Sequence, residues 1–364
     1  MKPAPDFTRF HTALLRQGEP DRVPLAEASV DYDVKCAFLG RRIQGIADEV
    51  EFWYRAGYDF VPMQAGFREV FWPHYLSKKR GGKVQEMTRK IQGDYTVYEE
   101  GTKERAWAPE DKGLVTTWEE FRAFPWPEAE DLDYSPIQEI CDLLPAGMRA
   151  VVYMGYIYTS VWWLMGFETF CFALRENPTL VEAIQEKVKE IQSRALQIVL
   201  GFEPVAALWH PDDIAYSEAL IISPSYLRKY VFPWYRWAAD LCGQRGIPSI
   251  YHSDGKLDEV IPDLIACGFS ALHPIEPKAM DIAQLKRRYG KDLCLIGNID
   301  LGYTLTRGTP AEVEEEVRQR IREVGPGGGY CVGSSNSVTS YVPLANFNAM
   351  REATFKYGRY PLSL

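Results

Sequence analysis

Short apolar runs alternate with longer amphipathic segments along most of the chain. The clearest apolar run, Pro248 to Tyr251, leads directly into the polar turn His252-Ser-Asp-Gly255. Amphipathic segments of helical length precede and follow it. This alternation is typical of βα units, in which parallel strands end at a functional face. The pattern therefore predicts a barrel whose strands carry polar side chains at their C-terminal ends.

Eight apolar runs are predicted to be strands, which is the number needed for a single (β/α)8 TIM barrel domain over residues 1–364. A helical extension over residues 1–22 is expected before the first strand. The predicted strands begin at Val23, Tyr58, Ala150, Pro204, Pro248, Gly268, Leu293 and Gly329. The principal predicted helices cover 46–57, 136–144, 179–200, 224–245, 256–267, 281–290, 310–324 and 345–357.

Residues 72–116 depart from this regular alternation. They contain a basic, glycine-containing stretch and a run of alternating character, Tyr95-Thr-Val-Tyr98. Period-two alternation beside glycine turns predicts a β-hairpin insertion outside the barrel. Long excursions of this kind often act as lids, so the insertion is a candidate cover for the active site.

Composition excludes several classes of function. The chain has 364 residues, 46% hydrophobic residues and a net charge of −9, so a nucleic-acid partner is not expected. The N-terminal residues have no apolar signal core, and no run is long enough to span a membrane, which predicts a cytoplasmic protein. Seven scattered cysteines without a Cys-x-x-Cys pair are interpreted as reduced thiols, most of them in the core.

Polar residues that could act in catalysis or bind a metal ion gather where the predicted strands end. They are expected to face one mouth of the barrel, where they could hold Zn²⁺ as a Lewis acid or act as general acids. Spacing alone does not choose between these chemistries. Asp254 could also cap the next helix, and His273 could simply end a strand before Pro274. The set comprises Glu27, His210, Asp212, His252, Asp254, His273, Glu276, Asn298, Asp300 and Asn336.

The stretch from Tyr156 to Phe167 is the most aromatic in the chain. It includes Tyr158, Trp162 and Trp163. Such a cluster is interpreted either as a wall of the core or as a platform for a flat aromatic or macrocyclic ligand. Phosphate-binding glycine loops and the Gly-x-Ser-x-Gly elbow are absent from the sequence, which argues against nucleotide and serine-hydrolase chemistry.

The strand-end motifs resemble those of the uroporphyrinogen decarboxylase superfamily. The resemblance rests on Asp21-Arg-Val-Pro-Leu25, His252-Ser-Asp-Gly255, Leu272-His-Pro-Ile-Glu-Pro277, Gly297-Asn-Ile-Asp300 and Gly308-Thr-Pro310. These motifs span the chain and imply a TIM barrel. The family's true decarboxylases carry an arginine-rich segment after the first strand, an aspartate after the second and a histidine loop after the eighth. The corresponding segments here contain none of these features.

The chain resembles most the superfamily's cobalamin-dependent methyltransferase branch. In that branch a zinc site is formed by His-x-Cys after the fifth strand and a further cysteine after the eighth. His252 matches, whereas Asp254 and Asn336 stand where the family has cysteines. The resemblance implies a corrinoid protein as partner, cobalamin as the partner's cofactor and a small methyl donor or acceptor. Oxygen and nitrogen ligands in place of thiolates point to methyl substrates other than thiols. Among these, the aromatic residues Tyr158, Trp162 and Trp163 favour methoxylated aromatics, and a metal-free enzyme is left open.

The resemblance and the residues together give three functional hypotheses. The first is a methyltransferase component that transfers a methyl group to or from a corrinoid. The others are a decarboxylase of a tetrapyrrole or aromatic acid, and a non-catalytic tetrapyrrole-binding protein; a homodimer is left open. For the methyltransferase we expect catalytic roles for Glu27, His210, Asp212, His252, His273 and Asn298. Substrate contacts are expected from Tyr158, Trp162, Trp163 and Asn336. One divalent ion, expected to be Zn²⁺, is predicted on His252, Asp254 and Glu276.

Overall fold

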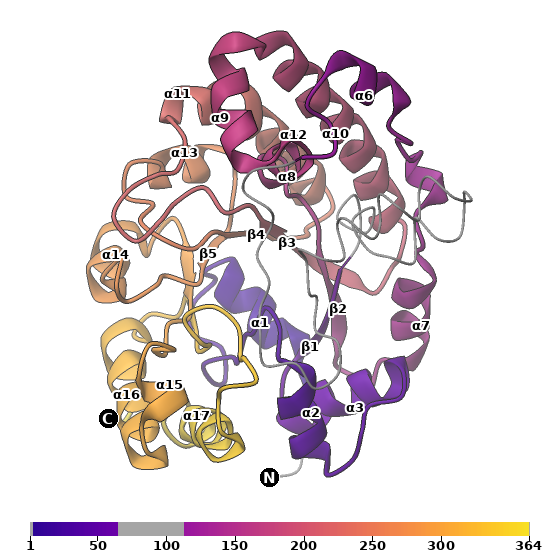
Figure 1. Ribbon diagram of the computed structural model, residues 1–364. Coiled ribbons are helices and arrows are strands. Elements are labelled where there is room, and N and C mark those ends of the chain that lie inside the picture. Colours follow the sequence, from indigo (N-terminus) through magenta and orange to yellow (C-terminus); the bar gives the residue numbers. More distant parts are fainter. Residues whose placement is uncertain (1–2, 65–112, 364) are drawn as a thin grey trace.

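Seven strands of the described residues form one parallel sheet that curls through the centre of the molecule (Figure 1). The computed structural model describes residues 3–64 and 113–363, so most of the insertion predicted at 72–116 lies outside the described residues. Strand order follows the sequence, as in an α/β barrel. The strands are β1 (Phe60–Gln64), β2 (Arg149–Tyr153), β3 (Val205–Pro211), β4 (Ser249–His252), β5 (Ala271–His273), β6 (Cys294–Ile296) and β7 (Tyr330–Cys331).

Helices surround the sheet, and most of those in the described residues follow the predicted ranges closely. The helix predicted at 256–267 is shorter than expected and covers only Ile261–Ala266. The boundaries of α16 (Pro310–Val324) agree with prediction. Its start is well defined because Thr309 and Glu312 form a capping box and Pro310 is the first helical residue. The other α-helices are α1 (Phe7–Leu14), α2 (Tyr32–Leu39), α3 (Ile46–Ala56), α6 (Trp118–Ala123), α7 (Ser135–Leu143), α8 (Thr159–Met165), α9 (Phe167–Glu176), α10 (Pro178–Val199), α11 (Pro224–Tyr226), α12 (Phe232–Gly243), α13 (Ile261–Ala266), α14 (Ile282–Tyr289), α15 (Thr304–Arg307) and α17 (Leu344–Tyr357). The part of the chain that the structure describes also has two short non-α helices, η2 (Ala129–Asp131) and η3 (Leu227–Val231).

The first predicted strand, beginning at Val23, does not form a regular strand of the sheet. Instead, Leu25 makes an isolated parallel bridge with Val332, directly after β7. Ala26 N–H donates to the Val332 carbonyl at 2.8 Å, and Val332 N–H donates to the Pro24 carbonyl at 2.9 Å. Pro24 has no N–H to donate, which explains why the ladder stays short. The segment still brings Glu27 beside the residues that follow β7.

The inside of the curled sheet is a separate hydrophobic core from the one beneath the outer helices. Buried side chains of α1, including Phe10, pack there against Phe60 and Trp209. Helix α1 lies behind the strands in Figure 1, and it contacts loops that precede strands: Phe7 N–H donates to the Gly147 carbonyl, ahead of β2. It therefore covers the N-terminal ends of the strands and leaves their C-terminal ends as the accessible mouth.

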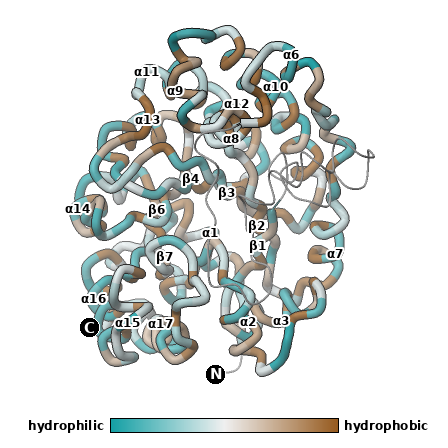
Figure 2. The backbone as a smooth tube through the Cα atoms, viewed as in Figure 1, coloured by the Kyte–Doolittle hydropathy of each residue, from teal (hydrophilic) through white to brown (hydrophobic). Residues whose placement is uncertain are grey.

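The outer helices pack on the sheet through one face each. Their tube alternates between brown and teal in Figure 2, as expected for helices with one buried and one exposed face. In α10 the buried positions include Leu180, Ile184, Val188 and Ile191, a helical spacing. Among the helices of the described residues, none combines the length and apolar composition needed to cross a membrane.

Candidate functional site

The alternation of side chains along the strands decides which polar residues face the mouth. Trp209, Ile250 and Ala271 belong to the interior core. The next position in each strand points outward and the one after points inward again. Register pairs Pro211 with His252 and His252 with His273, so both histidines lie on the inner face at the last positions of β4 and β5.

His252 and His273 contact each other through equivalent ring nitrogens. Their Nδ1 atoms are 2.7 Å apart, and the rings lie nearly parallel with centroids 4.9 Å apart. His273 is fully buried, and its ring stands edge-on against the Trp209 indole. Burial lowers the pKa of His273 well below its ordinary value, and the neighbouring His252 lowers it further. His273 is therefore a neutral imidazole beneath His252.

The outer nitrogen of His252 faces two carboxylates. Its Nε2 lies 3.7 Å from Asp213 Oδ1 and 4.0 Å from Asp254 Oδ1. These distances are too long for hydrogen bonds. One ligand atom from each of the three residues lies within 4.8 Å of the others, a spacing that could hold one metal ion. Nitrogen and oxygen donors at this spacing suit a divalent cation such as Zn²⁺.

Three side chains hold the Asp254 turn in place, and one of them is Asp213, whose Oδ1 accepts the Asp254 N–H at 3.2 Å. Asn336 Nδ2 donates to Asp254 Oδ2 at 2.6 Å, and Glu276 accepts the Gly255 N–H at 3.1 Å. Gly255 has φ +83°, and a Cβ there would lie 2.5 Å from the Tyr216 carbonyl oxygen, so the turn needs glycine. Of the predicted ligands, His252 and Asp254 come together, whereas Glu276 bonds to the turn and stands outside the cluster.

Asp213 is the cluster member that the sequence prediction missed. The chain offers Asp212 and Asp213 side by side after β3, and the prediction chose Asp212. Counting alternate positions from the inward Trp209 would have selected Asp213, which lines the mouth cavity. The signal was present in the sequence, but it required the register of β3.

His210 and Asp212 do not face the mouth, contrary to prediction. The His210 ring packs between the sheet and the helices, against Trp234, Tyr235 and Phe269, and burial lowers its pKa to about 3. Outward alternation from Trp209 is the physical reason for both positions.

Asp212 anchors the start of α8. Its carboxylate accepts the N–H groups of Tyr158 and Thr159 at 2.8 and 2.7 Å and the Tyr235 hydroxyl at 2.8 Å. Burial raises its pKa to about 6 in spite of these three donors. The geometry assigns this carboxylate to the packing of α8 and α12 on the sheet.

Glu27 is fully buried beside the segment that follows β7. Ser334 donates its N–H to Oε1 at 2.6 Å and its hydroxyl to Oε2 at 2.7 Å. Burial raises the pKa of Glu27 to about 8, although both hydrogen bonds act in the opposite direction. A Cβ at Gly333 would lie 2.1 Å from the Ala26 carbonyl oxygen, so glycine permits this close approach. Glu27 can hold a proton at neutral pH but does not line the cavity.

The two strand-end residues after β6 stabilise local backbone. Asn298 is buried, and its amide donates to the Ile275 carbonyl at 2.8 Å. Asp300 accepts the N–H groups of Gly302 and Tyr303 at 2.9 and 2.8 Å. Neither lines the mouth cavity among the described residues.

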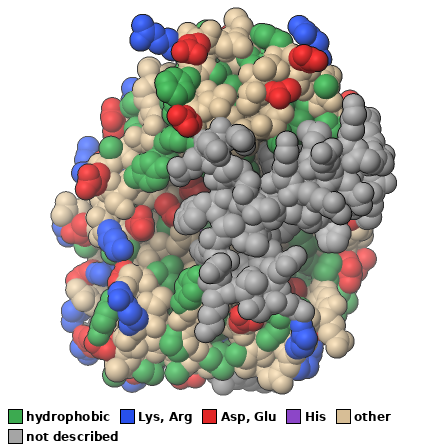
Figure 3. All heavy atoms as spheres, viewed as in Figure 1, with side chains coloured by type: hydrophobic (Ala, Val, Ile, Leu, Met, Phe, Trp, Pro, Cys, Tyr) green, Lys and Arg blue, Asp and Glu red, His purple; other side chains and the backbone are tan. Residues whose placement is uncertain are grey.

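The mouth opens into a cavity of 450 Å³ beside the cluster. Its described lining combines Asp213, His252, Asp254 and Asn336 with aromatic side chains. On the face shown in Figure 3, no histidine side chain of the described residues is visible. The aromatic lining residues are Trp53, Tyr153, Tyr156 and Trp163.

Only one of the three predicted aromatic contacts lines this cavity. Trp163 does so, stacked against Tyr156 with centroids 5.7 Å apart. Tyr158 is instead buried against Phe170 and Tyr226, because Tyr158 directly precedes α8 and turns into the helix layer. Trp162 packs beside Phe167.

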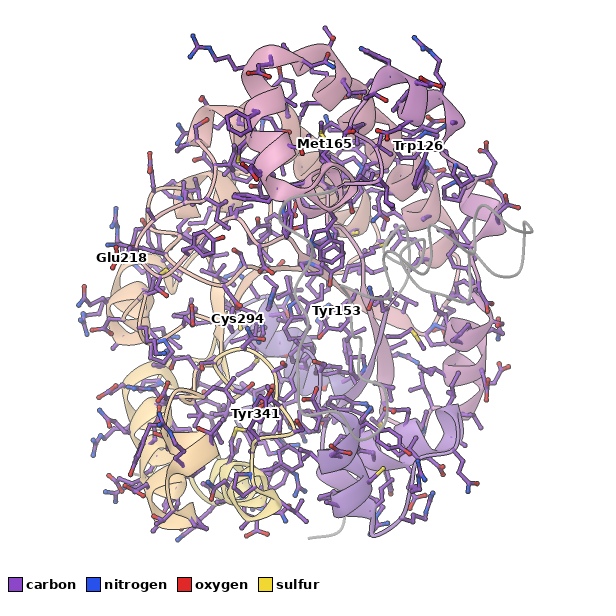
Figure 4. All side chains as sticks on the ribbon, in the orientation of Figure 1. Trp126, Tyr153, Met165, Glu218, Cys294 and Tyr341 are labelled. Atoms are coloured by element: carbon purple, nitrogen blue, oxygen red, sulfur yellow. The ribbon has the colours of Figure 1, made fainter. Side chains whose placement is uncertain are left out.

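The prediction did not include Tyr153, which Figure 4 labels near the centre of the molecule. It ends β2, stacks on Trp209 with centroids 5.2 Å apart and lines the cavity. Lys35 and Glu49, from α2 and α3, also line it and form an ion pair at 2.5 Å. These two were missed because helix positions before β1 carry no strand-end signal.

Comparisons with known proteins agree with this architecture. The model of the uroporphyrinogen decarboxylase (URO-D) family matches residues 111–357. The methylcobamide:CoM methyltransferase MtaA of Methanosarcina barkeri is 28% identical over 109 residues, which are 30% of this chain and 31% of that protein, so the match spans about a third of the relative. A solved structure, a methyltransferase from Methanosarcina mazei, covers 96% of this chain and 98% of its own with TM-score 0.68 and 16% identity, a likeness of fold.

Proposed function

Because this chain belongs to the uroporphyrinogen decarboxylase family, we propose that it is a methyltransferase that moves a methyl group between a small methylated substrate and a corrinoid held by a partner protein. The named relatives support the methyltransferase branch. The observation that carries the proposal is the cluster of Asp213, His252 and Asp254, which opens on an aromatic-lined cavity at the strand C-terminal ends.

The charges around the cavity favour a bound divalent cation. Glu49, Asp213 and Asp254 bring three carboxylates to the described lining, and Lys35 brings one ammonium group. Lys35 offsets one of these carboxylates, so two negative charges remain in the described lining, which one divalent cation would balance. A bound cation would supply Lewis-acid polarisation of the heteroatom that carries or receives the methyl group. Imidazole and carboxylate ligands suit Zn²⁺, and also Mn²⁺ or Fe²⁺, better than they suit soft ions.

The protein's own residues orient the reactants. Asn336 fixes the Asp254 carboxylate, and His252 keeps its Nε2 directed at the cluster through its contact with His273. The indole of Trp163 and the ring of Tyr156 offer a stacked wall for an aromatic substrate. Hard oxygen ligands are a poorer match for thiolate activation than cysteines are. We therefore propose methoxylated aromatics as the methyl donors.

A decarboxylase is the second candidate, and Glu27 is the observation that favours it. A carboxyl group with a pKa of about 8 retains its proton at pH 7, as a general acid must. Against it, Glu27 is fully buried, and the cavity's carboxylates repel a substrate rich in carboxylates. Release of carbon dioxide from tetrapyrrole or aromatic acids without cobalamin would favour this candidate over methyl transfer.

Incubation with cob(I)alamin and a panel of methoxyarenes, methylamines and methylthiols tests the proposal. We expect the visible spectrum of methylcobalamin to form with methoxyarenes and to be lost in Asp213→Asn, since that change removes a cluster carboxylate. Asp300→Asn is the matched control because Asp300 also follows a strand but caps a turn outside the cluster. No methylcobalamin from any donor would reject the proposal.

A further inference from the structure

The contact between His252 and His273 restricts where protons can lie. At 2.7 Å the two Nδ1 atoms are at hydrogen-bond distance, so one nitrogen must carry a proton and the other must accept it. Two lone pairs at this separation would repel, and two N–H groups would clash. The pair therefore shares one proton along this line, and each ring's tautomer depends on the other's.

A cation bound at the other ring nitrogen of His252 would determine which of the two histidines donates that hydrogen bond. His252 Nε2 faces Asp213 and Asp254, so Nε2 is the nitrogen that can coordinate an ion in the cluster. An imidazole that coordinates through Nε2 carries its proton on Nδ1. That N–H then points at His273 Nδ1, which must be its acceptor and must itself be unprotonated.

The surroundings of His273 suit it to this acceptor role. Its side chain is fully buried, and its Nε2 has no hydrogen-bond partner among the described residues. No described carboxylate forms an ion pair with it, so a charged imidazolium there would be uncompensated. The Trp209 ring packs edge-on against the His273 ring, with the ring centroids 4.7 Å apart. The pairing of β4 with β5 fixes His273 beside His252. The ring is thus held, neutral, in one orientation.

We infer that His273 is a positioning residue: in the cation-bound protein its Nδ1 accepts the His252 Nδ1–H and so fixes His252 as an Nε2 ligand. This inference rests on the proposed cation site. Metal-bound histidines often donate to a carboxylate, which raises their basicity. A neutral imidazole acceptor orients the ligand without adding negative charge to the site. The charge that holds the cation therefore comes from Asp213 and Asp254 on the cavity side.

Measurements of metal affinity distinguish an orienting role of His273 from a role in packing alone. We would titrate Zn²⁺ alone into chelator-treated full-length protein and its variants. His273→Leu introduces an apolar side chain of similar size and removes the acceptor nitrogen. We expect the affinity for Zn²⁺ to fall about 10- to 100-fold. His273→Asn places an amide oxygen near the former Nδ1, so it should stay within a few-fold of wild type. His210→Leu, a buried histidine away from the cluster, should leave affinity unchanged.

Nitrogen-15 spectra of histidine-labelled protein give a second readout that does not depend on activity. With Zn²⁺ bound, we expect His252 as the Nδ1–H tautomer and His273 as the Nε2–H tautomer. Wild-type affinity in His273→Leu, or the reverse tautomers in the zinc-bound protein, would overturn the inference while leaving the cation site standing. Failure of the wild type to bind Zn²⁺ would refute the site itself, and the inference with it.

Discussion

Replacing Glu27 with glutamine should remove a pH dependence of stability that the wild-type protein carries. Burial beside Ser334 raises the pKa of this carboxyl group from 4.5 to about 8. Between these two values the folded protein keeps a proton that the unfolded chain has released. The contribution of Glu27 to stability is therefore most favourable below about pH 4.5 and is lost progressively as the pH rises through 8.

The size of the effect follows from the same two values. Each pKa unit corresponds to about 1.4 kcal/mol, so the change across this window has an upper magnitude of about 5 kcal/mol. Glutamine has the same shape and no titration. Its carbonyl can accept the Ser334 N–H while its amide donates to the Ser334 hydroxyl oxygen. The variant should match the wild type in acid and be several kcal/mol more stable near pH 8.

Urea unfolding of both proteins at pH 5, 6.5 and 8 measures this difference directly. Asp212 and the buried histidines titrate in both proteins, so subtracting the two free energies of unfolding removes their contributions. A difference that grows with pH supports the buried, protonated carboxyl. An identical pH slope in both proteins, or a wild type that is the more stable at pH 8, would refute it.

Three further substitutions test separate parts of the structure. Asp212→Ala strands three buried donors at the start of α8 and should lower the free energy of unfolding by about 3 to 5 kcal/mol in urea denaturation. Phe10→Ala leaves a cavity where α1 covers the barrel interior and should cost about 3 to 5 kcal/mol in the same assay. Trp163→Ala should raise the KM for methoxyarenes in a steady-state assay while the metal content stays unchanged, because Trp163 lines the cavity but offers no ligand.

The sequence predicted the repeating architecture because each βα unit carries its own local signals. The capping box before α16 and the apolar run ending at His252 are examples, and the parallel order of the strands is confirmed. The resemblance to the uroporphyrinogen decarboxylase superfamily is confirmed as well. The segment beginning at Val23 was predicted as a full strand, but Pro24 limits it to isolated bridging.

The site was harder to predict because the direction in which a side chain points depends on the register of its strand as well as on its position near the strand end. His252 and Asp254 lie beside each other, whereas His210 and Asp212 point to the helix layer. Tyr158 looked equivalent to Trp163 in sequence, yet Tyr158 precedes α8 and packs against Phe170, whereas Trp163 lies within α8 and lines the cavity. A shift of one residue in register reverses the direction in which a strand side chain points. The composition of a strand does not determine its register.

Methyl transfer measured as a function of metal content tests whether the reaction depends on a cation bound by Asp213, His252 and Asp254. The full-length protein would be depleted of metal with a chelator and then reconstituted with increasing Zn²⁺, while methylcobalamin formation from a methoxyarene and cob(I)alamin is followed by its visible spectrum. We expect activity to disappear on depletion, to return in proportion to added metal and to saturate at one ion per chain, with no return in His252→Ala. Full activity in metal-free protein, or undiminished recovery in His252→Ala, would contradict it.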